Sequence, residues 1–348
     1  MIFLKIWYNI LGDDKMEHIS NNQILKTEFG FQFEHNLDDK KYVIQIVYPQ
    51  NTDNYSIPYI LVIPKQIKEG SMLAVEVNNY ESEEKNNLIN KALVTARDLT
   101  EKLKDNDNPV LVPVIPSVNG GIPYYQQLSK ECFNLSTDSP LYRIDLQVLN
   151  IIKAGKERIS KYANVSEKVF LNGYSSSGVF AQRFSLLHPE IVDTLCVGGA
   201  SGSIPMPTTE LQYPLGIADY YDITGKHFDY EAYSQIKFRY YVGSLEDTRK
   251  SSNRYDENGN FAPMHDMSYF DRSIPPVIGA QQRKLFGTNI IERSTKQIQL
   301  MKTMGLDIEQ VIFENRTHNN FNGIGVNKLG DEFVKYTYQQ SKTSEKKL

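Results

Sequence analysis

The sequence predicts an α/β protein whose mostly parallel, eight-stranded sheet carries helices on both faces. Three observations support this fold class. Short β-branched runs alternate with segments of helical apolar spacing, the alternation extends from about residue 40 to about residue 340, and only two long irregular stretches interrupt it. Strands that alternate with helices in this way form parallel sheets covered by their crossover helices.

The predicted strands are short apolar runs rich in β-branched residues. They occupy residues 42–49, 58–65, 72–79, 109–116, 168–173, 193–199, 238–243 and 309–314. Helices are predicted where apolar residues recur every three or four positions, as over 88–103, 148–159 and 180–187. Each of these helices falls between two predicted strands, so the chain is expected to cross from one strand to the next through a helix.

The two irregular stretches predict insertions into a single domain that spans residues 1–348. Residues 203–235 are rich in Pro and Tyr, and residues 250–286 are polar and weakly periodic. Long irregular segments in compact domains are usually functional, so we expect lid-like insertions in both places. The apolar first dozen residues are expected to pack on the body, with a membrane-interface role or a true start at Met16 as the alternatives. The tail 341–348 is expected to fray.

Charge and cysteine content narrow the class of partner. The chain has 348 residues and a formal net charge of −4, with acidic and basic residues interspersed. This balance predicts no nucleic-acid partner and favours a small neutral ligand. Cys132 and Cys196 are too few for a disulfide framework, which predicts a reduced, cytoplasmic setting. No apolar run reaches transmembrane length. The sequence leaves the oligomeric state open, and a homo-oligomer is one possibility.

Three consecutive serines in "GYSSSG", residues 173–178, follow a predicted strand and precede a predicted helix. A nucleophile in such a turn needs small residues two positions before and two positions after it, because the strand and the helix pass close together. Only Ser175 meets this requirement, with Gly173 before it and Ser177 after it. Ser175 is therefore the predicted nucleophile.

A serine nucleophile needs a base, and the base needs a carboxylate to orient it. In hydrolases with a sheet of this kind, the acid and then the histidine follow the serine along the chain. His318, after the last predicted strand, is the predicted base, and His265 is the weaker alternative. "VGSLEDT" offers two carboxylates as the acid. The spacing of three residues after Gly243 favours Glu246. Residue type favours Asp247, which is the preferred choice.

The remaining predicted site residues surround the same strand ends. An oxyanion hole needs two N–H donors, here the backbone of Ser176 and that of Asn79 or Tyr80. Tyrosines of the first insertion could contact an acyl chain or an aromatic ring. The predicted substrate contacts are Tyr174, Tyr220 and Tyr221. No nucleotide, flavin or metal motif occurs, so no cofactor and no metal are expected.

Together, "GYSSSG", "VGSLEDT" and "THNNF" resemble the α/β-hydrolase superfamily over roughly residues 40–340. Within it, "RIDLQVLNII" and "YPLGIADYYDITGKHFD" are similar to a group of bacterial esterase-like hydrolases, distantly related to feruloyl esterases and polyhydroxyalkanoate depolymerases. The resemblance implies a serine hydrolase that acts on an ester of unspecified identity. A peptidase or an acyltransferase of the same fold, or an inactive binding protein, remains the alternative.

Overall fold

The computed structural model describes residues 41–50, 52–78, 87–116, 125–246, 273–318 and 329–345. The described strands form one eight-stranded sheet in the order β1-β2-β4-β3-β5-β6-β7-β8. Every strand predicted from the sequence is present. Their bounds are β1 Tyr42–Val47, β2 Tyr59–Pro64, β3 Ser71–Val75, β4 Val110–Pro113, β5 Val165–Tyr174, β6 Val192–Gly198, β7 Lys237–Gly243 and β8 Ile308–Phe313.

The sheet is mostly parallel, as predicted. Only β2 runs against its neighbours, β1 and β4, and the strands from β4 to β8 are parallel to one another. The carboxyl ends of these parallel strands therefore lie at one edge of the sheet. Loops that leave β3, β5, β7 and β8 meet there, which is where open α/β sheets bind their ligands.

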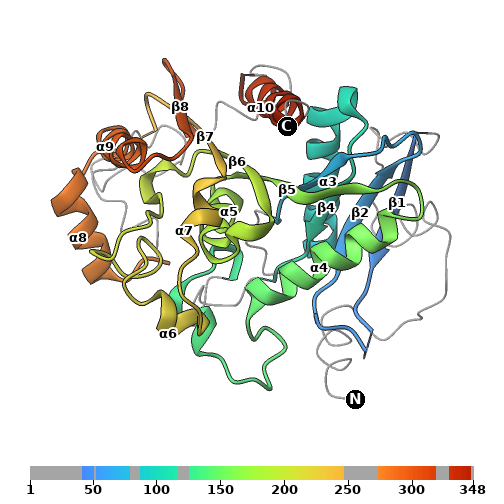
Figure 1. Ribbon diagram of the computed structural model, residues 1–348, viewed down its shortest axis with the longest axis horizontal. Coiled ribbons are helices and arrows are strands. Elements are labelled where there is room, and N and C mark those ends of the chain that lie inside the picture. The colour runs from blue at the N-terminus through green and yellow to red at the C-terminus, as the bar shows by residue number, and fades with distance from the viewer. Residues whose placement is uncertain are drawn as a thin grey trace, which may run out of the picture.

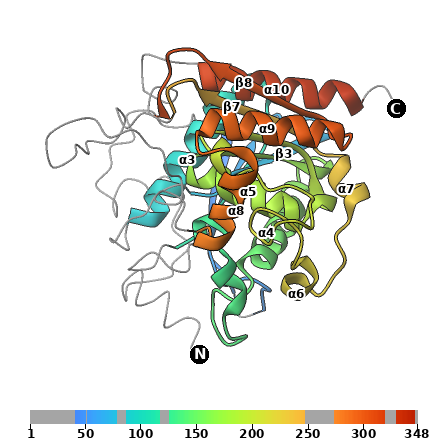
Figure 2. The same ribbon diagram turned by 90° about the vertical axis from the view of Figure 1, so that its left-hand side faces the viewer.

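Helices cover both faces of the sheet (Figure 1). Successive strand residues face opposite sides: Ile60 and Val62 pack toward α3 and α10, whereas Leu61 and Ile63 pack toward α4 and α5. Figure 2 shows α9 and α10 on either side of the β7–β8 end of the sheet. The helices are α3 Asn87–Leu103, α4 Ile144–Ile159, α5 Ser176–Leu187, α6 Tyr220–Thr224, α7 Tyr230–Ser234, α8 Pro276–Phe286, α9 Ile290–Thr303 and α10 Leu329–Glu345, and the short 3-10 turns are η1 Lys104–Asn106, η2 Tyr125–Gln127, η3 Lys130–Asn134, η4 Pro189–Ile191 and η5 Ser201–Ser203.

The first predicted insertion packs as part of the body. Its residue Tyr233 is buried and packs its ring against Phe238 at the amino end of β7. Tyr220 is also buried, and its hydroxyl donates to the carbonyl of Leu187 at the carboxyl end of α5. These tyrosines lie at the opposite end of the sheet from Ser175, so the structure does not place them over the carboxyl ends of the strands, and the lid-like role of residues 203–235 stays a prediction.

The other irregular regions are described only in part. Of the second predicted insertion, residues 273–286 are described, and helix α8 occupies most of them. The predicted frayed tail is wrong for residues 341–345, because α10 continues to Glu345 and Ser341 is buried with its hydroxyl bonded to the Tyr338 carbonyl. Residues 1–15 lie outside the described residues.

A buried ion cluster joins α4 to the end of α5. Asp145, in the first turn of α4, is fully buried and receives two hydrogen bonds from Arg143, at 2.9 and 2.7 Å. His188, directly after α5, contacts the same carboxylate through Nε2 at 3.1 Å. Burial acts to raise the pKa of Asp145, but these hydrogen bonds and charges outweigh it and lower the pKa to about 2.

Replacing Asp145 with alanine is expected to lower the free energy of unfolding by about 3–5 kcal/mol, because the partly buried Arg143 and the buried His188 lose their carboxylate. The stabilisation from this lowered pKa is present above the ordinary carboxylate value, about 3.9, and is lost as the pH falls toward 2. Urea unfolding at pH 6 and pH 3 should therefore show a smaller difference between wild type and Asp145→Ala at pH 3. The control is Glu157→Ala, an exposed carboxylate on the same helix. Equal losses of unfolding free energy in Asp145→Ala and Glu157→Ala would contradict the prediction.

Candidate active site

Ser175 occupies the turn between β5 and α5. Its backbone angles are φ +57° and ψ −120°, a conformation that non-glycine residues rarely adopt. Backbone hydrogen bonds on both sides maintain it: the Ser175 N–H donates to the Gly198 carbonyl, and the Ser175 carbonyl accepts from the Val179 N–H. Strained turns of this kind concentrate at functional sites and expose a nucleophile above a parallel sheet.

The close approach of β5 to α5 explains the small residues around Ser175. A Cβ atom on Gly173 would lie 2.5 Å from the Ser177 carbonyl oxygen and 2.6 Å from the Gly178 Cα. Any larger residue at 173 would push the strand and the helix apart. The size argument that selected Ser175 from the sequence thus has a direct steric cause at Gly173.

His318 connects Ser175 to a buried carboxylate. Its Nε2 lies 2.9 Å from Ser175 Oγ, and its Nδ1 contacts Glu246 Oε1. The two loops that supply His318 and Glu246 are tied by a hydrogen bond from the Leu245 N–H to the Arg316 carbonyl, at 2.9 Å. Three residues far apart in the sequence therefore meet at the carboxyl edge of the sheet.

Glu246, rather than the preferred Asp247, is the carboxylate that the structure brings to His318. The turn after β7 is tight, with the Glu246 N–H donating to the Gly243 carbonyl, so three residues suffice to reach the site. Asp247 and the alternative histidine, His265, lie outside the described residues.

Glu246 and His318 differ in their exposure to solvent. Glu246 is buried, whereas the His318 side chain is 29% exposed. A proton on Nδ1 donated to Glu246 leaves the Nε2 lone pair directed at the Ser175 hydroxyl, which is the tautomer that a base requires. The arrangement can therefore take a proton from Ser175.

Tyr174, predicted as a substrate contact, supports the histidine loop. Its hydroxyl donates to the backbone carbonyl of His318, and the two ring centroids are 5.2 Å apart. Burial raises the pKa of Tyr174, so it remains a neutral phenol and a hydrogen-bond donor.

The other predicted substrate contacts are not at this site. The Tyr220 hydroxyl reaches the Leu187 carbonyl, eleven residues beyond the first residue of α5, Ser176, or about 16 Å along the helix axis. Tyr221 is 58% exposed and lies against the His227 ring. The structure does not bring either tyrosine to Ser175.

One predicted oxyanion donor is described. Ser176 is the first residue of α5, and the first N–H groups of a helix have no partner within it and lie at its positive end. Asn79 and Tyr80 lie outside the described residues. The preceding residue, Asn78, is fully buried and exchanges two hydrogen bonds with the backbone of Ile115, which ties the ends of β3 and β4 together.

Three polar residues near the site were not identified from the sequence: Glu76, Asn78 and Ser177. Glu76 is the one carboxylate in the apolar run "MLAVEVNN", and an isolated charge in a predicted strand is the signal that could have identified it. Ser177 was taken only as a small residue. The structure shows that the side chains of Glu76 and Ser177 form hydrogen bonds behind the nucleophile turn.

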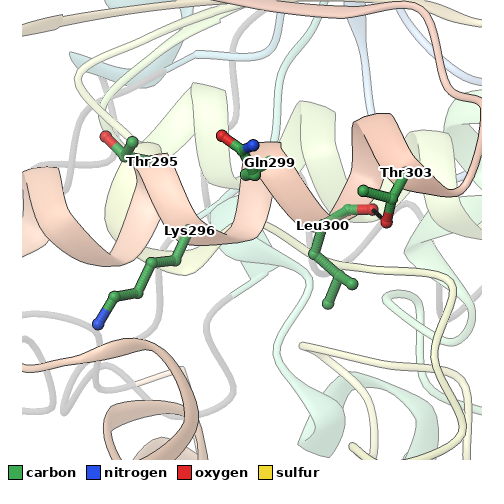
Figure 3. Close-up of a pocket in the computed structure, with 5 residues that line it drawn as sticks. All are labelled: Thr295, Lys296, Gln299, Leu300 and Thr303. Atoms are coloured by element: carbon green, nitrogen blue, oxygen red, sulfur yellow. Dashed lines mark hydrogen bonds between the residues drawn. The ribbon is translucent and has the colours of Figure 1, made fainter.

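Two hollows on the described surface lie away from Ser175. One, of about 460 Å³, is a shallow depression whose lining residues all belong to α9: Thr295, Lys296, Gln299, Leu300 and Thr303 (Figure 3). A second, of about 250 Å³, lies between η3 and α6. Since a single helix cannot enclose a ligand, the α9 depression is not the candidate active site.

The described residues contain neither a cluster of metal-ligating side chains nor a membrane-spanning helix. No group of three or more His, Cys, Asp or Glu side chains among them is placed to hold a metal ion. Within the same residues, no helix combines the length and apolarity needed to cross a membrane.

Gly199 allows a test of how tightly the histidine is packed. Its φ is +59°, and an added Cβ would lie 3.0 Å from His318 Cε1 and 2.9 Å from Tyr174 Cζ. Gly199→Ala is expected to displace the imidazole and to lower kcat about 10–100-fold on an ester. The control is Gly225→Ala, which has a similar φ of +69° with no atom near its Cβ, and therefore imposes backbone strain alone. An equal effect of both changes on kcat would contradict the prediction.

No protein-family model and no curated protein sequence matches the chain. Among solved structures, poly(aspartic acid) hydrolase-1 from Sphingomonas sp. KT-1 is 11% identical, with a TM-score of 0.52 over 86% of this chain and 97% of that one. The poly(3-hydroxybutyrate) depolymerase LpqC from Bordetella parapertussis is 14% identical, with a TM-score of 0.46 over 86% and 88%.

The chain therefore has the α/β-hydrolase fold. The strand order, the single antiparallel strand next to the first edge strand and the serine turn after β5 all agree with the structural similarity. The resemblance stated from the sequence is confirmed at the level of the fold.

Proposed function

We propose that this protein is a serine hydrolase that cleaves carboxylic esters through an acyl-enzyme on Ser175. The observation that carries the proposal is the chain of hydrogen bonds from Glu246 through His318 to Ser175. A serine hydroxyl is a poor nucleophile until a base removes its proton, and an imidazole oriented by a carboxylate does this effectively. The strained turn and the helix amino terminus beside it support the same proposal.

In the proposed acylation step, Ser175 Oγ attacks the ester carbonyl carbon while His318 Nε2 takes the hydroxyl proton. The carbonyl oxygen becomes an oxyanion, for which the Ser176 N–H and an N–H of Asn79 or Tyr80 are the proposed donors. The bond to the leaving alkoxide then breaks, and the imidazolium returns the proton to it. Glu246 stabilises the imidazolium and fixes the orientation of the ring.

Deacylation repeats these steps with water in place of the serine. His318 takes a proton from a water molecule, whose oxygen attacks the acyl carbon and again forms an oxyanion. The bond from the acyl carbon to Ser175 Oγ breaks, the proton passes from His318 to Ser175, and a carboxylic acid leaves. The cycle needs no cofactor or metal, because every proton and electron pair is supplied by the side chains, the substrate and water.

An ester is proposed as the substrate class because "RIDLQVLNII" and "YPLGIADYYDITGKHFD" are similar to segments of bacterial esterase-like hydrolases. The net charge of −4 favours a small neutral ester over a polyanion.

The proposal is tested with a fluorophosphonate probe and a panel of p-nitrophenyl esters and p-nitroanilides. The native protein is expected to hydrolyse the esters faster than the anilides and to carry the probe on Ser175, located by tandem mass spectrometry. Protein unfolded before exposure to the probe is the control, because the reactivity depends on folded geometry. A native protein that neither turns over the panel nor reacts, or that carries the label on another residue, would overturn the proposal.

A further inference from the structure

A buried carboxylate lies directly behind the serine turn. Glu76, one residue beyond the end of β3, is only 8% exposed. Its Oε2 accepts a hydrogen bond from Asn172 Nδ2 in β5 at 2.6 Å, and its Oε1 lies 3.2 Å from Ser177 Oγ in the first turn of α5. Glu76 therefore contacts both elements that meet at Ser175.

Ser177 links this carboxylate to the backbone of the turn. Its Oγ accepts the Tyr174 N–H at 2.9 Å and also lies 3.0 Å from the Tyr174 carbonyl oxygen. A hydroxyl has one proton, and donation to an ionised carboxylate is the stronger hydrogen bond. When that proton points to Glu76, an oxygen lone pair is directed at the N–H of Tyr174, the residue immediately before Ser175.

The surroundings of Glu76 show that this arrangement has an energetic cost. Burial raises the pKa of Glu76, and the charge of Lys102 on α3 acts in the opposite direction. Lys102 is in turn paired with Asp331 of α10, with Nζ 3.3 Å from Oδ1. An ion network with a buried member such as Glu76 can often be replaced by apolar residues without loss of stability. A contribution to the geometry of the turn gives this costly network a role that an apolar replacement would not fill.

We propose that Glu76, acting through Ser177, is a positioning residue that holds the turn carrying Ser175 in its reactive geometry. The inference rests on the proposed function, since it assigns a role in the reaction of Ser175. It also explains the serine at position 177, where the usual form of the motif has a second glycine. A glycine there would satisfy the steric requirement but would offer no acceptor for the Tyr174 N–H.

The test is a cycle of Glu76→Ala, Ser177→Ala and the double variant, measured by ester turnover and by the rate of fluorophosphonate labelling. Each single change is expected to lower kcat and the labelling rate about 10–100-fold, with KM within about threefold of wild type. The double variant is expected to be no slower than the slower single variant, because the two residues act as one unit.

Glu76→Gln is the conservative variant, and its kcat is expected within about threefold of wild type. The amide of Gln keeps an oxygen that accepts from the Ser177 hydroxyl. Asn172 Oδ1 is buried without a hydrogen-bond partner in the described structure. After a flip of the Asn172 side chain, this oxygen accepts the N–H of the new amide. If Glu76→Ala fails to fold, Ser177→Ala and Glu76→Gln decide the question. Ser185→Ala is the matched control, since Ser185 is a fully buried serine of α5 whose hydroxyl bonds only the Gln182 carbonyl in the described structure.

The outcomes are distinguishable. Three results would each overturn this inference alone. The first is a Ser177→Ala enzyme as fast as Ser185→Ala, and the second is a double variant in which the two losses of kcat multiply. The third is a Glu76→Gln enzyme as slow as Glu76→Ala, or as slow as Ser177→Ala where Glu76→Ala does not fold. A wild type that neither hydrolyses esters nor reacts with the probe would overturn the proposed function and this inference with it.

Discussion

His318→Ala is expected to lower kcat on a p-nitrophenyl ester by about a millionfold, with little change in KM. The imidazole is the one group within hydrogen-bond distance of Ser175 Oγ in the described structure that can take its proton. Removing the base from a serine–histidine pair costs nearly as much as removing the whole constellation, because the residues act as a unit. Steady-state kinetics with a correction for spontaneous hydrolysis would measure the loss.

His227→Ala is the control for this prediction, because His227 is exposed and contacts Tyr221, away from the serine. Its kcat should match that of wild type. Added imidazole should restore part of the activity of His318→Ala if the lost group is a proton acceptor beside Ser175. A His318→Ala enzyme that retains a tenth of its activity would contradict the prediction and would point to another base.

Glu246→Gln is expected to lower kcat about 10⁴-fold. The carboxylate accepts a hydrogen bond from His318 Nδ1, and an amide can present its NH₂ group there, which favours the imidazole tautomer with its proton on the wrong nitrogen. The amide also provides no charge to stabilise the imidazolium that forms as Ser175 attacks. Both effects act on the chemical step, so KM should change little.

Asp247→Asn is the matched change on the neighbouring carboxylate and distinguishes the two acids that the sequence left open. With Glu246 as the partner of His318, Asp247→Asn should keep at least a third of wild-type kcat. A loss confined to Asp247→Asn would assign the acid to Asp247 and contradict the prediction. Circular dichroism of both variants would separate loss of activity from loss of fold.

The fold was predictable from the sequence because its signals are local. Each strand is a short run of apolar, β-branched residues, and each crossover helix repeats its apolar residues at three- and four-residue spacing. Boundaries agreed within a few residues, as for the strand predicted at 238–243 and found at Lys237–Gly243. The sequence does not show where the first insertion packs, because its Pro and Tyr content gives no periodicity. Contacts with Leu187 and Phe238 show where Tyr220 and Tyr233 lie.

The candidate site was predictable where a local steric rule applies and not where distance in space decides. Gly173 and Ser177 single out Ser175 because they flank it in the same turn. The choice between Glu246 and Asp247 depends on how tightly the chain turns after β7, which residue type does not reveal. Nothing in the sequence indicates that the Tyr174 hydroxyl contacts the loop of His318, and the predicted contact of Tyr174 with substrate stays a prediction.

The sequence by itself determined the fold class, the strand order along the chain and the identity of the strained serine turn, because these follow from periodicity and from the size of adjacent residues. The tertiary structure alone decided which carboxylate reaches His318 and that Glu76 lies behind Ser177. The hydrogen bonds behind the turn join three segments of the chain, those of Glu76, Asn172 and Ser177. These segments come together only when the sheet and α5 assemble. Hydrogen bonds between residues so far apart in the sequence depend on how the strands are arranged in space, and no local sequence pattern predicts that arrangement.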